Sequence, residues 1–240
     1  MEQSATAKGR KVLLGISLFG NLGTLGIFKY YDFFARSLAA GLEELGIAHD
    51  PFLLKVILPV GISFYTFQAL SYTIDVYRGR IAAVRQADTF LAFVSFFPQL
   101  CAGPIERASH MLPQFQRART FDTARAVDGL RQMLWGFFKK IVIADNCSRL
   151  VDGIFNSSGT QPGPVLIIGA VLFAFQIYCD FGGYSDIAIG TAKLFGFDLM
   201  RNFAFPYFSR DMAEFWRRWH ISLSSWFRDY LYIPLGGSKG

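Results

Sequence analysis

The sequence predicts an all-α fold, a polytopic transmembrane helical bundle with re-entrant segments. Three observations support this prediction. Only 18% of the residues are charged, whereas soluble proteins carry about 25%. Hydrophobic residues make up 52% of the chain, and 26 of its residues are phenylalanine. Several apolar runs approach the length of about 20 residues that a helix needs to cross the hydrocarbon core. No internal repeat or linker marks a boundary, so we expect one membrane-embedded domain over residues 1–240.

The net charge of +6 does not indicate a nucleic-acid-binding protein. Basic residues lie between apolar segments, as in loops beside anionic lipid, and no zinc-finger spacing or basic tail is present. The three cysteines, Cys101, Cys147 and Cys179, are an odd number, so we expect packed thiols rather than disulfides. No cluster of metal-ligating residues stands out, and we predict no metal site.

The first half of the chain contains two predicted spans and one shorter apolar piece. Residues 12–30 form the first span, which we read as an uncleaved anchor, and residues 31–50 form the connection that follows. Residues 52–74 form the second span. Its hydroxyl and amide side chains suggest a bundle interior, although serine and threonine can equally bond back to their own helix. Residues 89–102 contain Pro98 and are too short to cross, which favours a re-entrant or interfacial piece.

Two further spans are predicted in the second half. Residues 130–154 form a long candidate, in which Lys139 and Lys140 are the weakness. The clearest span begins at Pro164 and becomes polar after eleven apolar residues, 165–175. An apolar helix that becomes polar near membrane depth is a candidate functional region.

That polar end also contains two adjacent glycines, Gly182 and Gly183. Glycine lacks a Cβ and adopts unusual backbone conformations easily, so this pair would permit a break in the helix.

The distribution of lysine and arginine predicts the orientation. Residues 78–131 contain eight arginines and residues 193–228 contain six basic residues, whereas residues 31–50 and 151–162 contain one arginine and none. Cytoplasmic loops carry the excess of positive charge. If residues 89–102 do not cross, every basic segment lies on the cytoplasmic side, and His220 lies near that face.

A polar and aromatic segment near the end of the chain, residues 214–230, contains three of the four tryptophans and His220. Projected as one helix at 100° per residue, it places most aromatic side chains on one half and most arginines and serines on the other. Two interpretations remain open. The segment is an interfacial amphipathic helix, or it is a buried helix that lines a polar cavity.

The sequence resembles the membrane-bound O-acyltransferase family, and most closely its bacterial branch that O-acetylates alginate and similar exopolysaccharides. The resemblance is carried by residues 58–68 (LPVGISFYTFQ), 97–105 (FPQLCAGPI), 176–186 (QIYCDFGGYSD) and 215–228 (FWRRWHISLSSWFR). It implies an enzyme that moves an acetyl or other short acyl group toward hydroxyls of an exported polysaccharide such as alginate. It also implies a multi-pass protein of the bacterial inner membrane.

The resemblance further implies an acyl donor, acetyl-CoA or another acyl thioester, with no tightly bound cofactor. It implies a periplasmic acetyltransferase partner and polysaccharide export machinery. The family has a second, principal histidine later in the chain, which we expect beyond Gly240, because His49 and His110 do not match it. We therefore expect a truncated core that holds one half of the site.

At the matching earlier position stands His220, which the resemblance implies is an accessory catalytic residue. Imidazole titrates near neutral pH, and neighbouring arginines would oppose its protonation and could stabilise an oxyanion. The alternative is that His220 only bonds a neighbouring helix. Asp180 is the next candidate, with an ion pair to Arg217 or Arg218 as its alternative. The other residues expected to line the substrate tunnel are Gln176, Tyr184, Ser185, Trp216, Arg217, Arg218, Trp219 and Ser222.

Two other functions remain open on the sequence. Intramembrane polar groups such as Asp180 and Gln176 also suit a transporter or channel with a polar pathway. An inactive fragment is the third interpretation, since part of the implied site is expected outside these residues.

Overall fold

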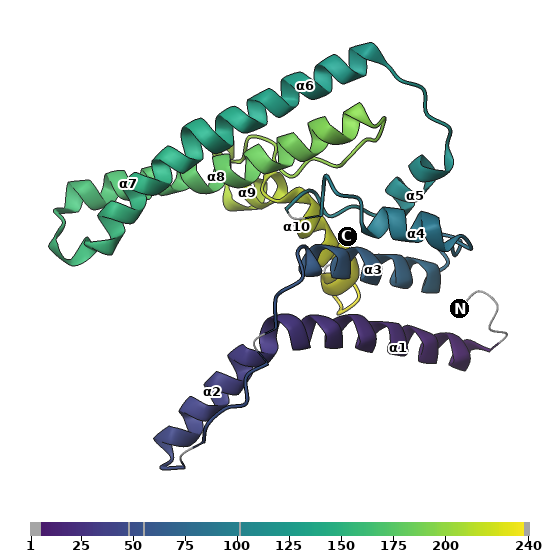
Figure 1. Ribbon diagram of the computed structural model, residues 1–240, viewed down its shortest axis with the longest axis horizontal. Coiled ribbons are helices and arrows are strands. Elements are labelled where there is room, and N and C mark those ends of the chain that lie inside the picture. Colours follow the sequence, from purple (N-terminus) through teal and green to yellow (C-terminus); the bar gives the residue numbers. More distant parts are fainter. Residues whose placement is uncertain (1–5, 48, 55, 101, 238–240) are drawn as a thin grey trace. The chain divides into compact units, whose positions relative to one another are not determined.

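The computed structural model describes residues 6–47, 49–54, 56–100 and 102–237 (Figure 1). Every regular element in these ranges is helical and none is a strand, so the all-α prediction is confirmed. In chain order the elements are α1 (Ala7–Leu25), the π-helix η1 (Gly26–Tyr30), α2 (Tyr31–Glu44), α3 (Ile62–Tyr77), α4 (Ala87–Val94), α5 (Ala108–Gln116), α6 (Thr123–Phe137), the π-helix η2 (Phe138–Ala144), α7 (Asp145–Asn156), η3 (Ser158–Thr160), α8 (Gly163–Leu194), η4 (Pro206–Phe208), α9 (Met212–Arg218), α10 (Ile221–Phe227) and the π-helix η5 (Arg228–Tyr232).

The chain divides into two compact units, which we describe separately. Unit 1 consists of Met1–Ser95 with Arg107–Ser109, and unit 2 consists of Phe96–Glu106 with His110–Gly240. The expectation of a single membrane domain stays a prediction.

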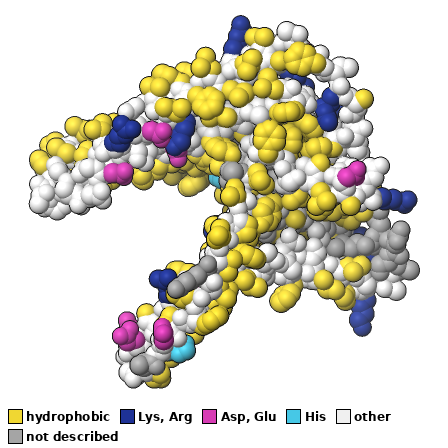
Figure 2. All heavy atoms as spheres, viewed as in Figure 1, with side chains coloured by type: hydrophobic (Ala, Val, Ile, Leu, Met, Phe, Trp, Pro, Cys, Tyr) yellow, Lys and Arg dark blue, Asp and Glu magenta, His cyan; other side chains and the backbone are white. Residues whose placement is uncertain are grey.

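Two described helical paths, Ala7–Glu44 and Gly163–Leu194, are long and apolar enough to cross a bilayer. Ile167, Ile168 and Val171, in the apolar half of α8, each leave more than half of their surface exposed. Figure 2 shows hydrophobic side chains spread widely over the surface in view. Large exposed apolar areas are typically in contact with another protein or with a membrane rather than with water. For these helices we expect contact with lipid.

The first helix of unit 1 continues beyond its predicted end. The prediction of a connection at residues 31–50 is wrong for residues 31–44, which are helical, because α1, η1 and α2 follow one another without interruption. Lys29 and Asp32 indicated an end in the sequence, but both find tertiary partners instead. Lys29 Nζ donates to Ser63 Oγ at 2.9 Å, and Asp32 accepts from the backbone N–H of Leu54 at 2.9 Å. Figure 1 shows a bend between α1 and α2, at the π-helix, which is a common cause of bends.

The second predicted span, residues 52–74, is only partly correct. Helix α3 begins at Ile62, directly after Gly61. The φ of Gly61 is 77°, in the left-handed region that glycine adopts easily. It packs on α1, where Ser17 and Thr73 share a hydrogen bond of 3.1 Å between their hydroxyls. The short apolar piece is confirmed as short, since α4 has eight residues and ends before Pro98.

Unit 2 is built around α8. The helices α6 and α7, joined by η2, form a helical path that contains the predicted span 130–154 and packs against α8 (Figure 1). The path begins where Asp122 caps α6: its carboxylate accepts the backbone N–H groups of Ala124 and Arg125 at 2.9 and 3.2 Å. Such a cap satisfies two of the N–H groups that have no partner within the helix.

The break that Gly182 and Gly183 would permit does not occur, because α8 is one unbroken helix. These glycines permit close packing instead. A Cβ on Gly183 would lie 2.8 Å from the carbonyl oxygen of Gly136, and one on Gly190 would lie 2.5 Å from that of Gly129. We call these four residues the glycine seam. Small residues let two helix backbones approach closely, and here they bring α6 and α8 together.

The glycine seam makes a prediction about stability. Gly183→Ala places a methyl group against the α6 backbone, which cannot move aside as a side chain can, so we expect a loss of about 1–3 kcal/mol. Gly153→Ala, in α7, is the matched control, because nothing lies within 4 Å of its added Cβ. Alanine there should be neutral or stabilise by up to about 1 kcal/mol. Thermal unfolding in detergent compares the two, and equal shifts would rule out the seam.

Candidate functional site

The segment at residues 214–230 is not the single helix that its pattern predicts. Helix α9 ends at Arg218, His220 has φ 43° and ψ 55°, and α10 begins at Ile221. A left-handed conformation at a residue other than glycine costs about 1–2 kcal/mol, so the surrounding structure must hold it. The projection at 100° per residue therefore fails at His220, because the turn redirects everything that follows.

A strap formed by residues 202–204 holds this turn. The carbonyl oxygen of Asn202 accepts the N–H of Ile221 at 2.9 Å, and the N–H of Ala204 donates to the carbonyl of Arg218 at 3.0 Å. These two bonds flank Trp219 and His220. They satisfy backbone groups that a continuous helix would have paired within itself, which explains how the turn is maintained.

The side chain of Asn202 joins three parts of unit 2. Its amide nitrogen donates to Ser185 Oγ of α8 at 2.9 Å, and its amide oxygen accepts from Ser222 Oγ of α10 at 2.6 Å. Ser222 Oγ in turn accepts the N–H of Ile105 at 3.0 Å. Asn202 is 1% exposed and Ser222 is fully buried. A buried polar network in which each member is satisfied fixes one arrangement of the chain.

The imidazole of His220 packs edge-on against the ring of Phe181, with centroids 4.6 Å apart. Its Nε2 is buried and has no hydrogen-bond partner among the described residues. Burial lowers the pKa of His220 to about 4, so the ring is neutral at physiological pH. A neutral imidazole with an unused nitrogen can donate or accept one hydrogen bond from an incoming group.

A cavity of about 310 Å³ lies between α6, α8 and residues 201–205. Its wall contains a charged pair, Lys139 of η2 with Asp186 of α8, whose side chains are 10% and 21% exposed. Gln132 donates to Asp186 at 2.9 Å. The remaining lining is Trp135, Tyr178, Gly182, Ser185, Ile189, Arg201, Asn202, Phe203 and Phe205.

The cavity and His220 are connected through aromatic rings. Phe203 lines the cavity and contacts Phe181 at 5.1 Å and Trp219 at 5.0 Å between centroids. Phe181 is the ring that contacts His220. His220 does not line the cavity, and the rings of Phe181 and Phe203 lie between the imidazole and the cavity.

The structure brings some predicted site residues together and not others. Ser185 lines the cavity, and Ser222 and Trp219 lie in the networks around it. Asp180 does not: it is paired with Lys140 at 2.6 Å, not with Arg217 or Arg218, and its side chain is 53% exposed.

The remaining predicted residues have mixed surroundings. Arg218 pairs with Glu214 at 2.5 Å, whose pKa is held low mainly by the backbone N–H of Arg210 and by the Arg210 side chain. Trp216 and Arg217 are exposed, Tyr184 is half-buried, and the amide oxygen of Gln176 is buried without a hydrogen-bond partner in the part of the chain that the structure describes.

Of the residues that line the cavity, only Ser185 was predicted as a site residue, and the missed ones include Gln132, Lys139, Asp186, Arg201 and Asn202. In the sequence, Lys139 was a weakness of the predicted span at residues 130–154. The carboxylate that neutralises it, Asp186, lies 47 residues later, at the polar end of α8. A lysine and an aspartate in two adjacent apolar segments are the signal that could have identified the pair. No local signal marks Asn202.

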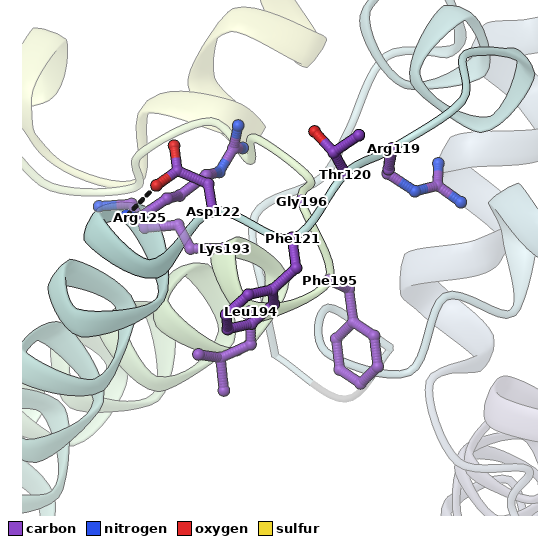
Figure 3. Close-up of a pocket in the computed structure, with 9 residues that line it drawn as sticks. All are labelled: Arg119, Thr120, Phe121, Asp122, Arg125, Lys193, Leu194, Phe195 and Gly196. Atoms are coloured by element: carbon purple, nitrogen blue, oxygen red, sulfur yellow. Dashed lines mark hydrogen bonds between the residues drawn. The ribbon is translucent and has the colours of Figure 1, made fainter.

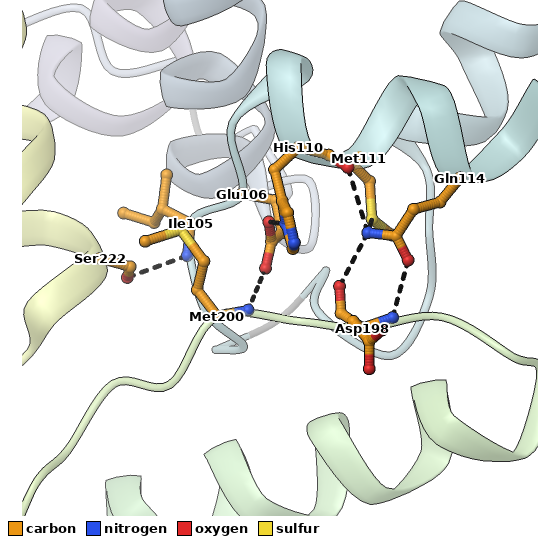
Figure 4. A network of polar contacts seen from close by, with 8 residues as sticks. All are labelled: Ile105, Glu106, His110, Met111, Gln114, Asp198, Met200 and Ser222. Atoms are coloured by element: carbon orange, nitrogen blue, oxygen red, sulfur yellow. Dashed lines mark hydrogen bonds and ion pairs between the residues drawn. The ribbon is translucent and has the colours of Figure 1, made fainter. Parts of the chain in front are cut away.

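A second network fixes the segment that leads to the strap (Figure 4). Glu106 is fully buried and accepts the N–H of Met200 at 2.5 Å and a hydrogen bond with His110 Nδ1 at 2.8 Å. Gln114 donates to the carbonyl of Asp198 at 3.0 Å and accepts its N–H at 2.8 Å. The start of the strap is therefore anchored two residues before Asn202.

The Glu106–His110 bond predicts a pH dependence. The hydrogen bond to Glu106, opposed by burial and supported by the charges of Glu106 and Asp198, raises the pKa of His110 above its usual 6.5. Stabilisation by a group with a raised pKa is complete below pH 6.5 and is lost as the pH rises through the folded-state pKa. His110→Gln should therefore lower the melting temperature by about 1–4 °C at pH 5.5 and by less at pH 8.5. A deficit that grows with pH would contradict this origin.

Fold and site define a membrane-helical protein with a polar cavity between its helices and the loop at residues 201–205. The chain belongs to the membrane-bound O-acyltransferase family, whose family model, MBOAT, matches residues 86–240. The matched residues include the cavity, the strap and His220.

Three curated relatives show the range of similar proteins. The chain is 45% identical to the probable alginate O-acetylase AlgI of Pseudomonas syringae pv. tomato, over 96% of this chain and 44% of that protein. It is 35% identical to a peptidoglycan O-acetyltransferase of Helicobacter pylori, over 96% and 48%. It is 30% identical to a teichoic acid D-alanyltransferase of Streptococcus thermophilus, over 73% and 44%. The chain spans less than half the length of these relatives.

Proposed function

We propose that the protein to which this chain belongs is an O-acyltransferase that moves an acetyl or other short acyl group toward hydroxyls of an exported polysaccharide such as alginate. The observation that supports this most is the polar cavity beside His220, in a member of an acyltransferase family. The relatives named above all carry the names of acetylating or alanylating enzymes. Charged residues within membrane helices often mark a substrate pathway, and the Lys139–Asp186 pair lies on the cavity wall.

The proposed reaction is attack by a hydroxyl oxygen on the acyl carbon of a thioester. The new C–O bond forms, the C–S bond breaks, and the thiolate leaves with the proton of the hydroxyl. Arg201 supplies positive charge at the cavity, beside the Lys139–Asp186 pair, where the carbonyl oxygen becomes negative. His220 has an accessory role, because its neutral ring can orient the hydroxyl but is a weak base at a pKa of about 4.

We assign the remaining site residues accordingly. Ser185, Trp219 and Ser222 shape the cavity and the turn, and Asp180 and Gln176 are proposed to line the substrate tunnel, as the resemblance implies. Tyr184, Trp216, Arg217 and Arg218 are proposed to line the passage toward it. The proposed donor is acetyl-CoA or another acyl thioester, the partners are a periplasmic acetyltransferase and the export machinery, and the location is the bacterial inner membrane, crossed several times.

Reconstitution in liposomes tests the function. Labelled acetyl thioester is supplied on one side, and polysaccharide with a periplasmic acetyltransferase on the other. We expect acetyl label to appear on the polysaccharide only when the protein is present. Movement of the polysaccharide or of the intact thioester across the membrane, without acetyl transfer, would instead indicate a transporter.

A further inference from the structure

Unit 2 contains a second pocket, of about 430 Å³, between the end of α8 and the segment before α6 (Figure 3). Figure 3 shows Arg119 and Arg125 on its wall directed away from each other. Arg125 already pairs with Asp198 at 2.7 Å, and Lys193 pairs with Asp128 at 2.5 Å. These charges balance within the protein, so they require no ligand. The smaller cavity of about 310 Å³ differs, because the hydrogen bonds behind its wall set the direction of a hydroxyl group that faces it.

That hydroxyl belongs to Ser185 of α8, which lines the cavity and is only 3% exposed. A serine hydroxyl has one O–H donor and two acceptor lone pairs. Which of these the cavity meets depends on the bond that the hydroxyl makes on its other side. The partner there is Asn202, whose side chain also reaches Ser222. The direction of both bonds follows from the burial of Ser222.

Ser222 must donate its hydroxyl hydrogen to Asn202. Its Oγ accepts the backbone N–H of Ile105 at 3.0 Å, and its other bond among the described residues is the 2.6 Å contact with Asn202. Ser222 is fully buried and does not line the cavity, so a hydrogen without an acceptor there would be costly. Asn202 therefore presents its amide oxygen to Ser222.

The amide nitrogen of Asn202 then faces Ser185 and donates to its Oγ at 2.9 Å. Ser185 uses a lone pair in this bond and keeps its hydrogen. Thr191, six residues later in α8, donates its hydroxyl hydrogen to the carbonyl of Ile187 at 2.7 Å, the usual acceptor four residues earlier. Ser185 makes no such bond to a carbonyl of its helix within the part of the chain that the structure describes. Its hydrogen is therefore available to a group in the cavity.

The network makes Ser185 a stronger and better positioned donor than an isolated serine. The bonds run in one direction, from the Ile105 N–H through the side chains of Ser222 and Asn202, and each polarises the next. Asn202 and Ser185 are 1% and 3% exposed, so water competes little for this hydroxyl. Arg201 adds positive charge to the same cavity. The cavity therefore suits an oxygen atom that accepts a hydrogen bond and becomes negative.

We propose that Ser185 donates a hydrogen bond to the carbonyl oxygen of the acyl group that is transferred. This role rests on the proposed function and names a residue that activates the acyl donor. The serine hydroxyl keeps its proton throughout. The carbonyl oxygen becomes negative when the polysaccharide hydroxyl attacks, so the hydrogen bond is stronger in the transition state than in the bound donor. The apolar part of the lining, including Trp135, Ile189 and Phe203, suits the hydrocarbon of a short acyl group.

The test compares two ligands that differ at the acyl carbonyl, with the purified full-length protein in detergent. In the first, a methylene group replaces the thioester sulfur of acetyl-coenzyme A, which leaves a ketone that cannot be transferred. The second, S-ethyl-coenzyme A, has no carbonyl oxygen. Ser185→Ala should weaken binding of the ketone about 5–10-fold, as expected for one hydrogen bond, and should change binding of the ethyl analogue by less than about twofold.

Turnover provides a second measurement. Removal of one donor to a developing oxyanion lowers kcat by about 10²–10³, so Ser185→Ala should lower kcat by about 100-fold or more, with KM changed by less than about tenfold. Thr191→Val is the matched control, because it removes a hydroxyl that bonds its own helix, and it should leave binding and turnover unchanged. Ser185→Cys keeps a weak S–H donor and should lie between serine and alanine.

The two ligands separate a contact with substrate from an effect on the fold. Equal loss of both analogues in Ser185→Ala, or unchanged binding of both, would overturn the proposal. A serine that acted only through the Asn202 network would not distinguish a ketone from an ethyl group. Failure of the unmodified protein to bind either analogue would instead reject the acetyl-coenzyme A donor of the proposed function, and this role of Ser185 with it.

Discussion

His220→Ala should lower acyl transfer by about 100-fold while the protein stays folded. The imidazole has a buried nitrogen with no hydrogen-bond partner among the residues described, and it is held toward Phe181 by the strained turn and the strap. A side chain that transfers the proton contributes about 10²–10⁴ in rate, and one that only orients the hydroxyl is expected at the lower limit of that range. The measurement is acetyl content of the polysaccharide per amount of protein.

Two matched variants show whether that loss of activity comes from the imidazole of His220. His49→Ala removes the same atoms from a histidine outside unit 2 and should leave transfer unchanged. His220→Asn should retain more activity than His220→Ala, because asparagine tolerates the left-handed conformation and keeps a hydrogen-bonding group there. Equal activity in the alanine variants at positions 220 and 49 would remove His220 from the site.

Lys139→Met should destabilise the protein by about 3 kcal/mol. It leaves the Asp186 carboxylate with only the hydrogen bond from Gln132 in a largely buried place. Breaking a buried ion pair from one side costs about 3–5 kcal/mol, and partial exposure of Asp186 to the cavity favours the low end. Thermal or denaturant unfolding in detergent measures the loss.

The adjacent lysine provides the control. Lys140 pairs with Asp145 and Asp180, but its side chain is 42% exposed, so Lys140→Met should cost at most about 1 kcal/mol. Adding Asp186→Leu to Lys139→Met should recover most of the stability, because no unpaired charge remains, but it should abolish transfer. A double variant as unstable as the single one would show that the pair does not act as a unit.

The sequence predicted the parts of the fold that depend on local composition. The apolar run after Pro164 became α8, and the short run ending before Pro98 became α4. The prediction from sequence failed where contacts between residues far apart in the chain determine the structure. Lys29 and Asp32 continue a helix because Ser63 and Leu54 bond them, and Gly183 stays helical because α6 packs against it.

The site residues also divide into those that local sequence predicts and those that only the fold brings together. Ser185 and Ser222 were predicted because polar residues in a membrane protein indicate functional ground, and both are buried in the Asn202 network. Asn202 itself lies in a loop with an ordinary composition, and its role depends on three elements that only the fold brings together. The left-handed turn at His220 was hidden for the same reason, since the strap that holds it lies 16 or more residues earlier.

Solvent access to the cavity is the most direct test of a water-filled acyl-transfer cavity. In a protein whose Cys101, Cys147 and Cys179 are replaced by alanine, Gln132→Cys places a thiol on the cavity wall and Ile168→Cys places one on the exposed apolar half of α8. With the protein in membranes, a water-soluble maleimide should label position 132 quickly, an acyl thioester should protect it, and position 168 should stay unlabelled. An unlabelled position 132, or labelling that the thioester does not change, would contradict a water-filled acyl-transfer cavity.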